Sequence, residues 1–255
     1  MKRFLAIARA GEASRHGTWL SGARNFDVLV AYYGDQPGKY SEQAELYDHK
    51  KGLKYPWFHA FIERSPWIYD YKAVLLADDD LEADSETLSD AFEIFSERKL
   101  WLAQPSLELG SYFSFPMLFT KPGSLLRHTA FVEEQMPIFS RETLHRLRST
   151  FAETVSGWGQ AISWMNRLGY PLDRVGVIDA APVRHVRPLK AGEMYTRELP
   201  ALGIKAMDEL KMMRARYKDD YQHIVLSDVA LDPAHPKTPA RRARQERTWR
   251  PPTTP

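Results

Sequence analysis

Three consecutive aspartates, Asp78, Asp79 and Asp80, directly follow an apolar run over residues 74–77. Such a run predicts a buried strand, and in open α/β sheets ligands bind beyond the carboxyl ends of the strands. Adjacent carboxylates repel one another unless a cation joins them, and Mg²⁺ and Mn²⁺ prefer such oxygen ligands. In an extended chain Asp78 and Asp80 point to one side, so this pair is predicted to bind a metal. The alternative is a solvated acidic loop that caps the next helix.

His185 is the second candidate, six residues after Asp179 in the segment DAAPVRH. Its imidazole could complete a metal site, although a lone histidine is also a common structural or surface residue. Arg184 and Arg187 beside it could hold phosphate through charge-assisted hydrogen bonds, or form a solvated edge.

The segment Ser156-Gly157-Trp158-Gly159 combines glycines, which permit close backbone approach, with an indole that has one flat apolar face. This combination suits a platform for a sugar ring, and it suits core packing equally well.

Polar residues after the second predicted strand and its neighbour could contact a nucleotide. Asp35 could accept a hydrogen bond from a ribose hydroxyl or a base edge, or simply form a Gly-Asp turn. Lys51 and Lys54 could meet a diphosphate, or remain solvated surface residues.

Alternating strands and helices must position these residues. Apolar and amphipathic periodicity predicts strands over residues 4–8, 26–33, 71–77, 101–104 and 175–179, and helices over 57–64, 84–98, 141–154, 158–169 and 204–217. The aromatic, proline-broken stretch 106–139 is expected to hold short antiparallel strands. The pattern predicts an α/β domain with a largely parallel sheet over residues 1–232, and a disordered Pro/Arg-rich tail over 233–255.

Composition narrows the functional classes. The chain has 255 residues, 44% of them hydrophobic, and no cysteine, which excludes disulfides, thiolate metal sites and thiol catalysis. From residue 237 onward there are six basic residues and one acidic residue, whereas the remainder carries 29 basic and 32 acidic residues. A body with that excess of acid argues against nucleic-acid binding. The basic tail could contact an anionic membrane peripherally.

Several familiar signatures are missing from the sequence. It has no Walker-A loop, no GxGxxG after the first predicted strand, no HExxH and no GxSxG. It also has no apolar stretch long enough to span a bilayer. We therefore expect a cytoplasmic protein, with membrane association limited to peripheral contact.

Taken in order, six pieces resemble one family: RNFDVLVAYYGD, KGLKYPWFHAFI, YDYKAVLLADDDLE, AQPSL, SGWG and VGVIDAAPVRH. The family is catalogued as domain of unknown function seven-zero-seven, and it is similar to glycosyltransferases of the GT-A fold. The resemblance covers about residues 3–188. It implies a GT-A-like fold, with a mixed, mainly parallel sheet flanked by helices, a nucleotide-sugar donor, and Mn²⁺ or Mg²⁺ as cofactor.

The resemblance also implies a role for each candidate. Asp78 and Asp80 would be the metal-binding DxD pair, and His185 the late metal ligand. The residues expected to bind the nucleotide sugar are Arg9, Ser14, Asp35, Lys51, Lys54, Asp79, Gly157 and Trp158. Of these, Arg9, Ser14 and Asp35 would hold the nucleoside, and Gly157 and Trp158 would border the donor sugar or the acceptor.

One position departs from the family pattern. Plant members carry Gly-Leu-Asp after the tryptophan, whereas this chain has Gly159-Gln160-Ala161. An inverting enzyme would place its general base in that region, and alanine cannot serve. Asp179 is the next candidate base, with Glu153 behind it. Otherwise the base lies elsewhere, the enzyme is retaining, or activity is lost.

Three hypotheses follow. The first is a metal-dependent glycosyltransferase that moves a sugar from a nucleotide donor to a glycan or glycolipid acceptor. The second is a non-catalytic nucleotide- or carbohydrate-binding protein that keeps the fold. The third is a metal-dependent phosphoesterase that uses the aspartate triplet.

Overall fold

A wholly buried strand, β1 (Phe4–Ala10), lies inside the central sheet, between the parallel strands β2 (Phe26–Tyr32) and β4 (Ala73–Asp78). Strands covered on both faces read as continuous apolar runs, which is why the sequence predicts these three. The computed structural model describes residues 2–217 and 224–232, and the expected tail, 233–255, lies outside them.

The sheet has ten strands and is mainly parallel. Its main path runs β10-β7-β9-β6-β8-β4-β1-β2-β3, and β5 pairs with β9 beside this path. Along the path only β7 and β8 run against the other strands. The bounds of the remaining strands are β3 (Leu46–His49), β5 (Leu81–Glu82), β6 (Leu102–Leu107), β7 (Ser124–Thr129), β8 (Ile138–Ser140), β9 (Val175–His185) and β10 (Val225–Ala230).

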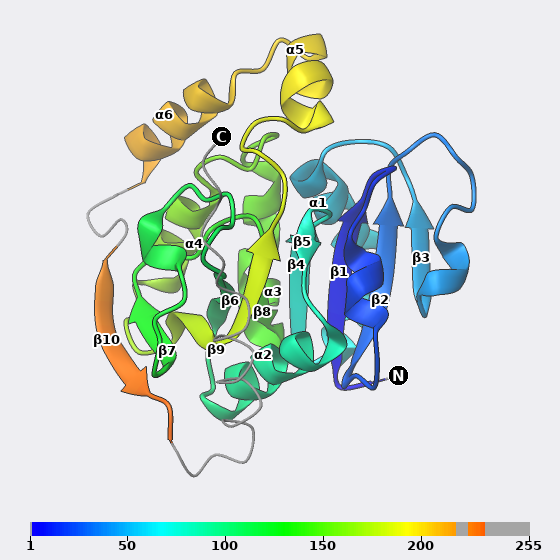
Figure 1. Cartoon of the computed structure of the whole chain (residues 1–255). Helices are drawn as coiled ribbons and strands as arrows, with labels where there is room; N and C mark the ends of the chain where they lie inside the picture. The colour runs from blue at the N-terminus through cyan, green and yellow to red at the C-terminus, as the bar shows by residue number, and fades with distance from the viewer. Residues whose placement is uncertain (1, 218–223, 233–255) are drawn as a thin grey trace, which may run out of the picture.

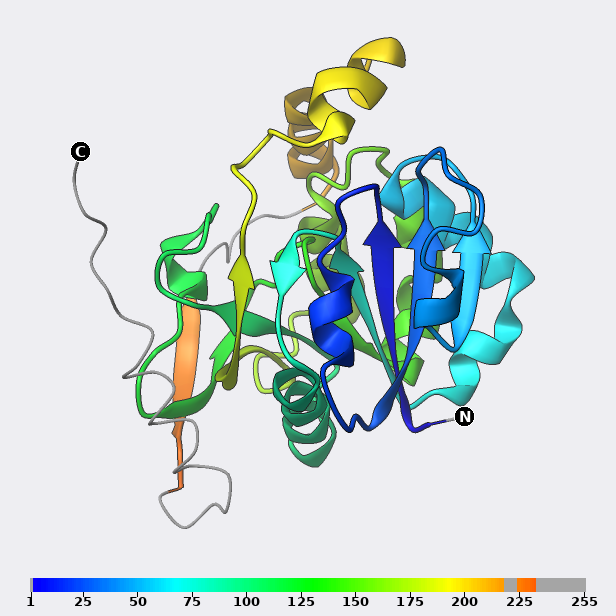
Figure 2. The ribbon, with the colours of Figure 1, turned by 45° about the vertical axis from the view of Figure 1, so that its right-hand side comes forward.

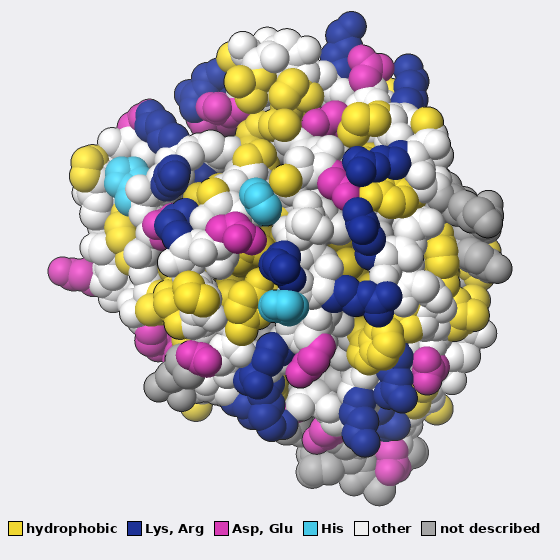
Figure 3. Space-filling model, turned by 180° about the vertical axis from the view of Figure 1, so that it is seen from behind, with side chains coloured by type: hydrophobic (Ala, Val, Ile, Leu, Met, Phe, Trp, Pro, Cys, Tyr) yellow, Lys and Arg dark blue, Asp and Glu magenta, His cyan; other side chains and the backbone are white. Residues whose placement is uncertain are grey.

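Helices cover both faces of the sheet (Figure 1). Side chains alternate between faces along a strand, so Phe4 of β1 stacks on Phe92 of α2 (Ser85–Glu97), whereas Leu5 joins the other core with α1 (Lys54–Arg64). Helices α3 (Arg141–Leu147) and α4 (Gln160–Leu168) belong to this second core. Figure 3, seen from behind, shows basic, acidic and hydrophobic side chains intermixed over this face.

Several element ends differ from those expected. Helix α1 begins three residues earlier, at Lys54. The helix expected over 141–154 ends at Leu147 and continues as a 3-10 helix over Arg148–Ala152. Strand β9 runs to His185 rather than to residue 179, because Val183 still pairs with β6 and the last two residues pair with β5.

Beyond β9 the chain forms a cap, residues 188–217, near the carboxyl ends of the parallel strands (Figures 1 and 2). The cap contains a π-helix over Met194–Glu198, a short helix α5 (Leu199–Ala201) and a longer helix α6 (Ala206–Arg216). Among residues 2–217 and 224–232, no helix combines the length and the hydropathy that a membrane span requires.

Candidate functional site

A cavity of about 840 Å³ lies between the cap and the carboxyl ends of strands β1, β4 and β9. The structure brings ten of the predicted site residues to its wall. They are Arg9, Asp35, Lys51, Lys54, Asp78, Asp79, Asp80, Gly157, Trp158 and His185. Two predicted residues, Ser14 and Asp179, do not line it.

Asp80 and His185 face each other across the cavity wall. The pairing of β5 with β9 sets Leu81 opposite His185, and this register brings the Asp80 Oδ2 atom to 3.2 Å from His185 Nε2. The Tyr112 carbonyl oxygen, 2.9 Å from His185 Nδ1, accepts a hydrogen bond from that nitrogen. In a neutral imidazole the Nε2 lone pair therefore points at Asp80. The other Asp80 oxygen, Oδ1, is buried with no hydrogen-bond partner among the described residues.

Charge around this pair shifts both pKa values. Burial acts to raise the pKa of Asp80, but its hydrogen bond and Coulomb attraction to His185, together with Arg187, outweigh burial and lower it. Burial acts to lower the pKa of His185, but Asp80 outweighs burial and raises it. The two shifts therefore favour positive charge between the carboxylate of Asp80 and the imidazole of His185.

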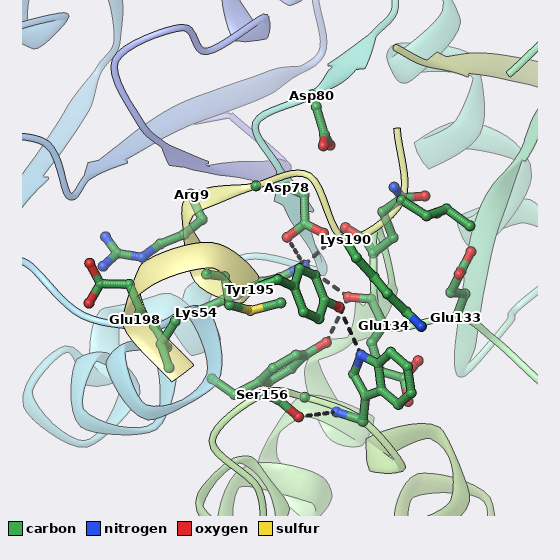
Figure 4. A pocket seen from close by; sticks show the side chains of 18 of the residues that line it. Arg9, Lys54, Asp78, Asp80, Glu133, Glu134, Ser156, Lys190, Tyr195 and Glu198 are labelled. Atoms are coloured by element: carbon green, nitrogen blue, oxygen red, sulfur yellow. Dashed lines mark hydrogen bonds and ion pairs between the residues drawn. The ribbon is translucent and has the colours of Figure 1, made fainter. Parts of the chain in front are cut away.

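Asp78 is directed elsewhere. Strand β4 ends at Asp78 and the chain turns at residues 79–80, so Asp78 and Asp80 do not extend to one side as expected. The Lys54 ammonium donates to Asp78 Oδ1 at 2.8 Å, and to the carbonyl oxygens of Glu134 and Gln135 at 2.9 Å each. Figure 4 shows Asp78 directed toward Lys54, with Asp80 apart from them. Within the described ranges, no three His, Cys, Asp or Glu side chains form a cluster that could hold a metal.

Asp79 is a buried connector. Its Oδ2 atom accepts from the Gly11 backbone nitrogen at 2.7 Å and from the Tyr33 hydroxyl at 3.3 Å, and its Oδ1 atom accepts from Arg187 at 3.0 Å. Burial raises the pKa of its carboxyl group. These contacts join the loop after β1 to the segment after β9, so Asp79 shapes the cavity floor.

Arg9 plays a similar supporting part. Its guanidinium donates to the carbonyl oxygens of Ala31, Lys50 and Gly52, and stacks 4.8 Å from the Trp57 ring. Burial lowers its pKa to about 10. These bonds fix the loop before α1, which carries Lys54 into the cavity.

The other residues expected to lie near the nucleoside are found at separate places in the structure. Asp35 and Lys51 form an exposed ion pair at the cavity rim. Ser14 instead places its hydroxyl 2.7 Å from Nδ1 of the buried His16, outside the cavity wall.

The Ser156–Gly159 loop faces the cap. The Trp158 indole nitrogen donates to the Tyr195 hydroxyl at 2.8 Å, and the Lys190 ammonium lies 5.2 Å from the indole centroid. Gly157 has a φ of +89°, and a Cβ there would lie 2.6 Å from the Tyr55 ring. Glycine at this position therefore allows the loop to reach the cavity.

The surroundings of Asp179 do not suit the role of general base expected of it. Its carboxylate is fully buried and accepts from Arg127 Nε and Nη2 at 2.8 Å each, and from the Lys121 backbone nitrogen at 3.0 Å. A carboxylate held in this bidentate pair, away from the cavity, is not placed to take a proton from a substrate there. Glu153 is likewise outside the cavity wall, bonded to the Tyr217 hydroxyl.

Four glutamates that the sequence analysis did not single out line the cavity, two on the cap, Glu193 and Glu198, and two in the body of the domain, Glu133 and Glu134. Glu133 and Glu134 lie between β7 and β8, and both line the cavity. Glu134 Oε1 accepts from the Ala161 backbone nitrogen at 3.1 Å, in the first turn of α4. Burial raises its pKa. The available signal was a pair of acids inside the otherwise apolar stretch FVEEQMPIF.

Glu133 has a side-chain hydrogen bond with Ser114, which acts to lower the pKa of its carboxyl group, but burial outweighs this bond. Its Oε2 atom is buried without a hydrogen-bond partner in the described part of the chain. Burial raises the pKa of this carboxyl group to about 7. The cavity thus holds a carboxyl group that can change charge near neutral pH.

No model of a known protein family matches the chain, and no curated protein does. Solved structures do match. A crystal structure of residues 1–349 of S. aureus TarS has a TM-score of 0.53 and 14% identity, covering 86% of this chain, which spans 66% of that one. The same TarS piece in complex with UDP-GlcNAc has a TM-score of 0.51, 14% identity and coverage of 85% and 72%. With UDP the TM-score is 0.52, at 13% identity and coverage of 86% and 67%.

At this identity the likeness concerns the fold. The mixed, mainly parallel sheet flanked by helices confirms the expected fold class. The chain has a GT-A-like fold similar to that of TarS, with the 840 Å³ cavity at the carboxyl edge of the sheet.

Proposed function

We propose that this chain is a metal-dependent glycosyltransferase that binds a nucleotide-sugar donor in the 840 Å³ cavity. The observation that carries the proposal is the Asp80–His185 pair at the carboxyl edge of a GT-A-like sheet. The complexes of the similar TarS with UDP-GlcNAc and UDP support a nucleotide sugar as the ligand class. The family resemblance, domain of unknown function seven-zero-seven, is part of the same proposal.

The residues fit a divalent cation held by two protein ligands. Asp80 supplies a carboxylate with one buried oxygen unpartnered, and His185 presents Nε2 because its Nδ1 is bonded to Tyr112. Mg²⁺ and Mn²⁺ commonly take one or two protein ligands and complete their shell with substrate phosphates and water. The cation would stabilise charge that develops on the departing diphosphate. Asp78, held by Lys54, would remain outside the metal shell.

Other cavity residues would hold and orient the substrates. Lys54 lies beside Asp78 and Arg187 beside Asp79, so both bring positive charge to the region where a diphosphate would bind. The Trp158 face, fixed by its hydrogen bond to Tyr195, would border a sugar ring. Asp35 and Lys51 would contact the nucleoside at the rim.

Glu134 takes the place of the base expected near residue 161. Its carboxylate is bonded to the Ala161 nitrogen, so a carboxylate from another segment occupies the region where plant members carry aspartate. A base there would accept the proton of the acceptor hydroxyl as that oxygen attacks the anomeric carbon. The donor–diphosphate bond then breaks and the nucleotide leaves with its electron pair, as in single-displacement, inverting transfer.

Release of nucleoside diphosphate tests the proposal. Purified protein with Mn²⁺ and a panel of UDP- and GDP-sugars should release nucleoside diphosphate, and Asp80→Asn should abolish the release. Metal-dependent donor binding without any release or transfer would favour the non-catalytic binding protein, which Ala161 motivates. Hydrolysis of simple phosphodiesters to a phosphomonoester and an alcohol would instead indicate the phosphoesterase.

A further inference from the structure

Seven large hydrophobic side chains are exposed on two segments that contribute to the cavity wall, the loop after β6 and the cap. Three lie on the loop after β6: Leu109, which is 72% exposed, Tyr112 and Phe113. Four more lie on the cap: Leu189, Leu202, Met207 and Met212. We call these seven residues the apolar rim. Single exposed hydrophobic residues are ordinary, but a gathering of them marks an interaction surface.

The two parts of the apolar rim flank the candidate metal pair. The Tyr112 backbone bonds to His185 twice, with its nitrogen donating to the His185 carbonyl oxygen at 3.1 Å and its own oxygen accepting from Nδ1. Leu189 follows four residues after His185 and lines the cavity. Figure 2 shows the loop after β6, the chain beyond β9 and the cap helices on the same upper side of the molecule.

Basic side chains are interspersed with the apolar rim. Lys190, Lys205 and Arg216 are exposed, and none has a carboxylate partner among the described residues. At the upper edge of Figure 3, hydrophobic side chains stand among basic and acidic ones. The surface therefore offers apolar groups for insertion, together with basic side chains that have no carboxylate partner in the described ranges; of these, Lys190 lies over the Trp158 ring and Arg216 over the Tyr217 ring.

This combination favours a lipid surface over a protein partner. The cores of protein interfaces are depleted in lysine, whereas a peripheral membrane surface combines Leu, Met and aromatic side chains with Lys and Arg that attract anionic headgroups. We propose that the apolar rim docks on an anionic bilayer and sets the cavity mouth at the level of the lipid headgroups. Docking goes beyond the proposed function, and the corollary that the acceptor is carried on a lipid rests on that function.

Vesicle sedimentation tests the docking. The rim variant Leu109→Ser/Phe113→Ser/Met212→Ser should bind vesicles of phosphatidylglycerol and phosphatidylcholine at least tenfold more weakly than the unchanged chain. The matched control is Leu172→Ser, 45% exposed in the loop before β9 at the opposite end of the sheet, and it should bind as the unchanged chain does. Lys205→Gln/Arg216→Gln should weaken binding to anionic vesicles and reduce its salt dependence.

Further measurements distinguish docking of the apolar rim on a bilayer from contact through the tail and from binding of a second copy of the chain. A chain shortened after Asp232 should keep most of its vesicle binding, and loss of all binding in that chain would overturn the proposal by assigning contact to the tail. A dimer in solution that the rim variant dissociates would assign the surface to a second copy and also overturn it. Equal vesicle binding by the rim variant and the unchanged chain would overturn it directly.

The docking and the proposed function can fail separately. The rim variant should keep metal-dependent nucleotide binding, because none of its three positions contacts Asp80, His185 or Lys54 in the bonds described above. Loss of vesicle binding with intact nucleotide binding supports docking whether or not sugar transfer is detected.

Discussion

The positions of the carboxylates determine which of them could act on a substrate in the cavity. Asp80 and Glu134 line the cavity, whereas Asp179 lies outside its wall in a bidentate pair with Arg127. The sequence analysis named Asp179 as the next candidate base because Ala161 cannot serve. No local pattern reveals that Arg127, 52 residues away, neutralises it.

Replacing Glu134 tests the proposed base. Glu134→Gln keeps the shape and can still accept from the Ala161 nitrogen, but it cannot take a proton. We expect sugar transfer to fall by about 10²–10⁴-fold, the usual contribution of general-base catalysis, with nucleotide affinity unchanged. Steady-state transfer rates and nucleotide titrations measure the two effects. Asp179→Asn is the contrasting variant, and we expect it to lower stability through loss of the buried pair. Transfer that survives Glu134→Gln unchanged would exclude Glu134 as the base.

The raised pKa of Glu133 predicts that the free energy of unfolding depends on pH. Burial raises the pKa of its carboxyl group from 4.5 to about 7, so the folded chain holds a proton that the unfolded chain loses at lower pH. The stabilisation from this proton is complete below pH 4.5 and is lost as the pH rises to about 7. The difference amounts to up to about 3 kcal/mol, at 1.36 kcal/mol per pKa unit.

Urea unfolding at pH 5 and pH 8 measures this effect. The free energy of unfolding of the unchanged chain should decrease, relative to that of Glu133→Gln, between these two pH values. Parallel curves for the two proteins would show that Glu133 does not titrate in this range.

At the scale of elements, the parallel core and helix α6 were predicted from the sequence, whereas the placement of the cap beside the cavity was not. Strands β1, β2 and β4 and helix α2 follow from apolar runs, helical periodicity and the Asp84 N-cap, which accepts from the Thr87 nitrogen at 2.8 Å. The turn at residues 79–80 broke the expected alignment of Asp78 with Asp80, since it depends on β5 pairing with a strand a hundred residues later. Few local sequence patterns indicate how the cap contacts the rest of the domain.

Helix α6 is attached to the site loop by one carboxylate. Glu209 accepts from the backbone nitrogens of Val155 and Ser156 at 2.7 and 2.8 Å, and Met213 packs where a Cβ on Gly159 would come within 2.7 Å. Glu209→Gln should weaken these charge-assisted bonds, at a cost of about 1–3 kcal/mol, and loosen the cap. Amide hydrogen exchange in α6 should rise, whereas Glu193→Gln, which removes an exposed pair with Arg197, should leave it unchanged. Unaltered exchange in both variants would show that Glu209 does not anchor the cap.

At the scale of the whole molecule, we propose that residues 1–232 form a single domain. Strand β10 pairs with β7 at the edge of the sheet, so the segment that carries it contributes to the fold even though it follows the cap. A chain shortened after Asp232 should therefore unfold in one transition at the same temperature as the full chain. A chain shortened after Tyr217 should unfold at a lower temperature, because the edge of β7 loses its partner. Equal thermal transitions for the two shortened chains would contradict this boundary.

The central claim is that the Asp80–His185 pair holds a divalent cation together with a nucleoside diphosphate. Calorimetric titration tests this claim most directly. UDP and GDP are titrated into the full chain with and without Mn²⁺, and then into Asp80→Asn, His185→Ala and the control Leu172→Ser, whose exposed side chain lies outside the cavity wall. The account predicts that one nucleotide binds in a Mn²⁺-dependent manner, that the first two variants lose this dependence, and that Leu172→Ser keeps it. Mn²⁺-dependent binding that persists in both Asp80→Asn and His185→Ala, or binding of neither nucleotide to the folded chain, would contradict it.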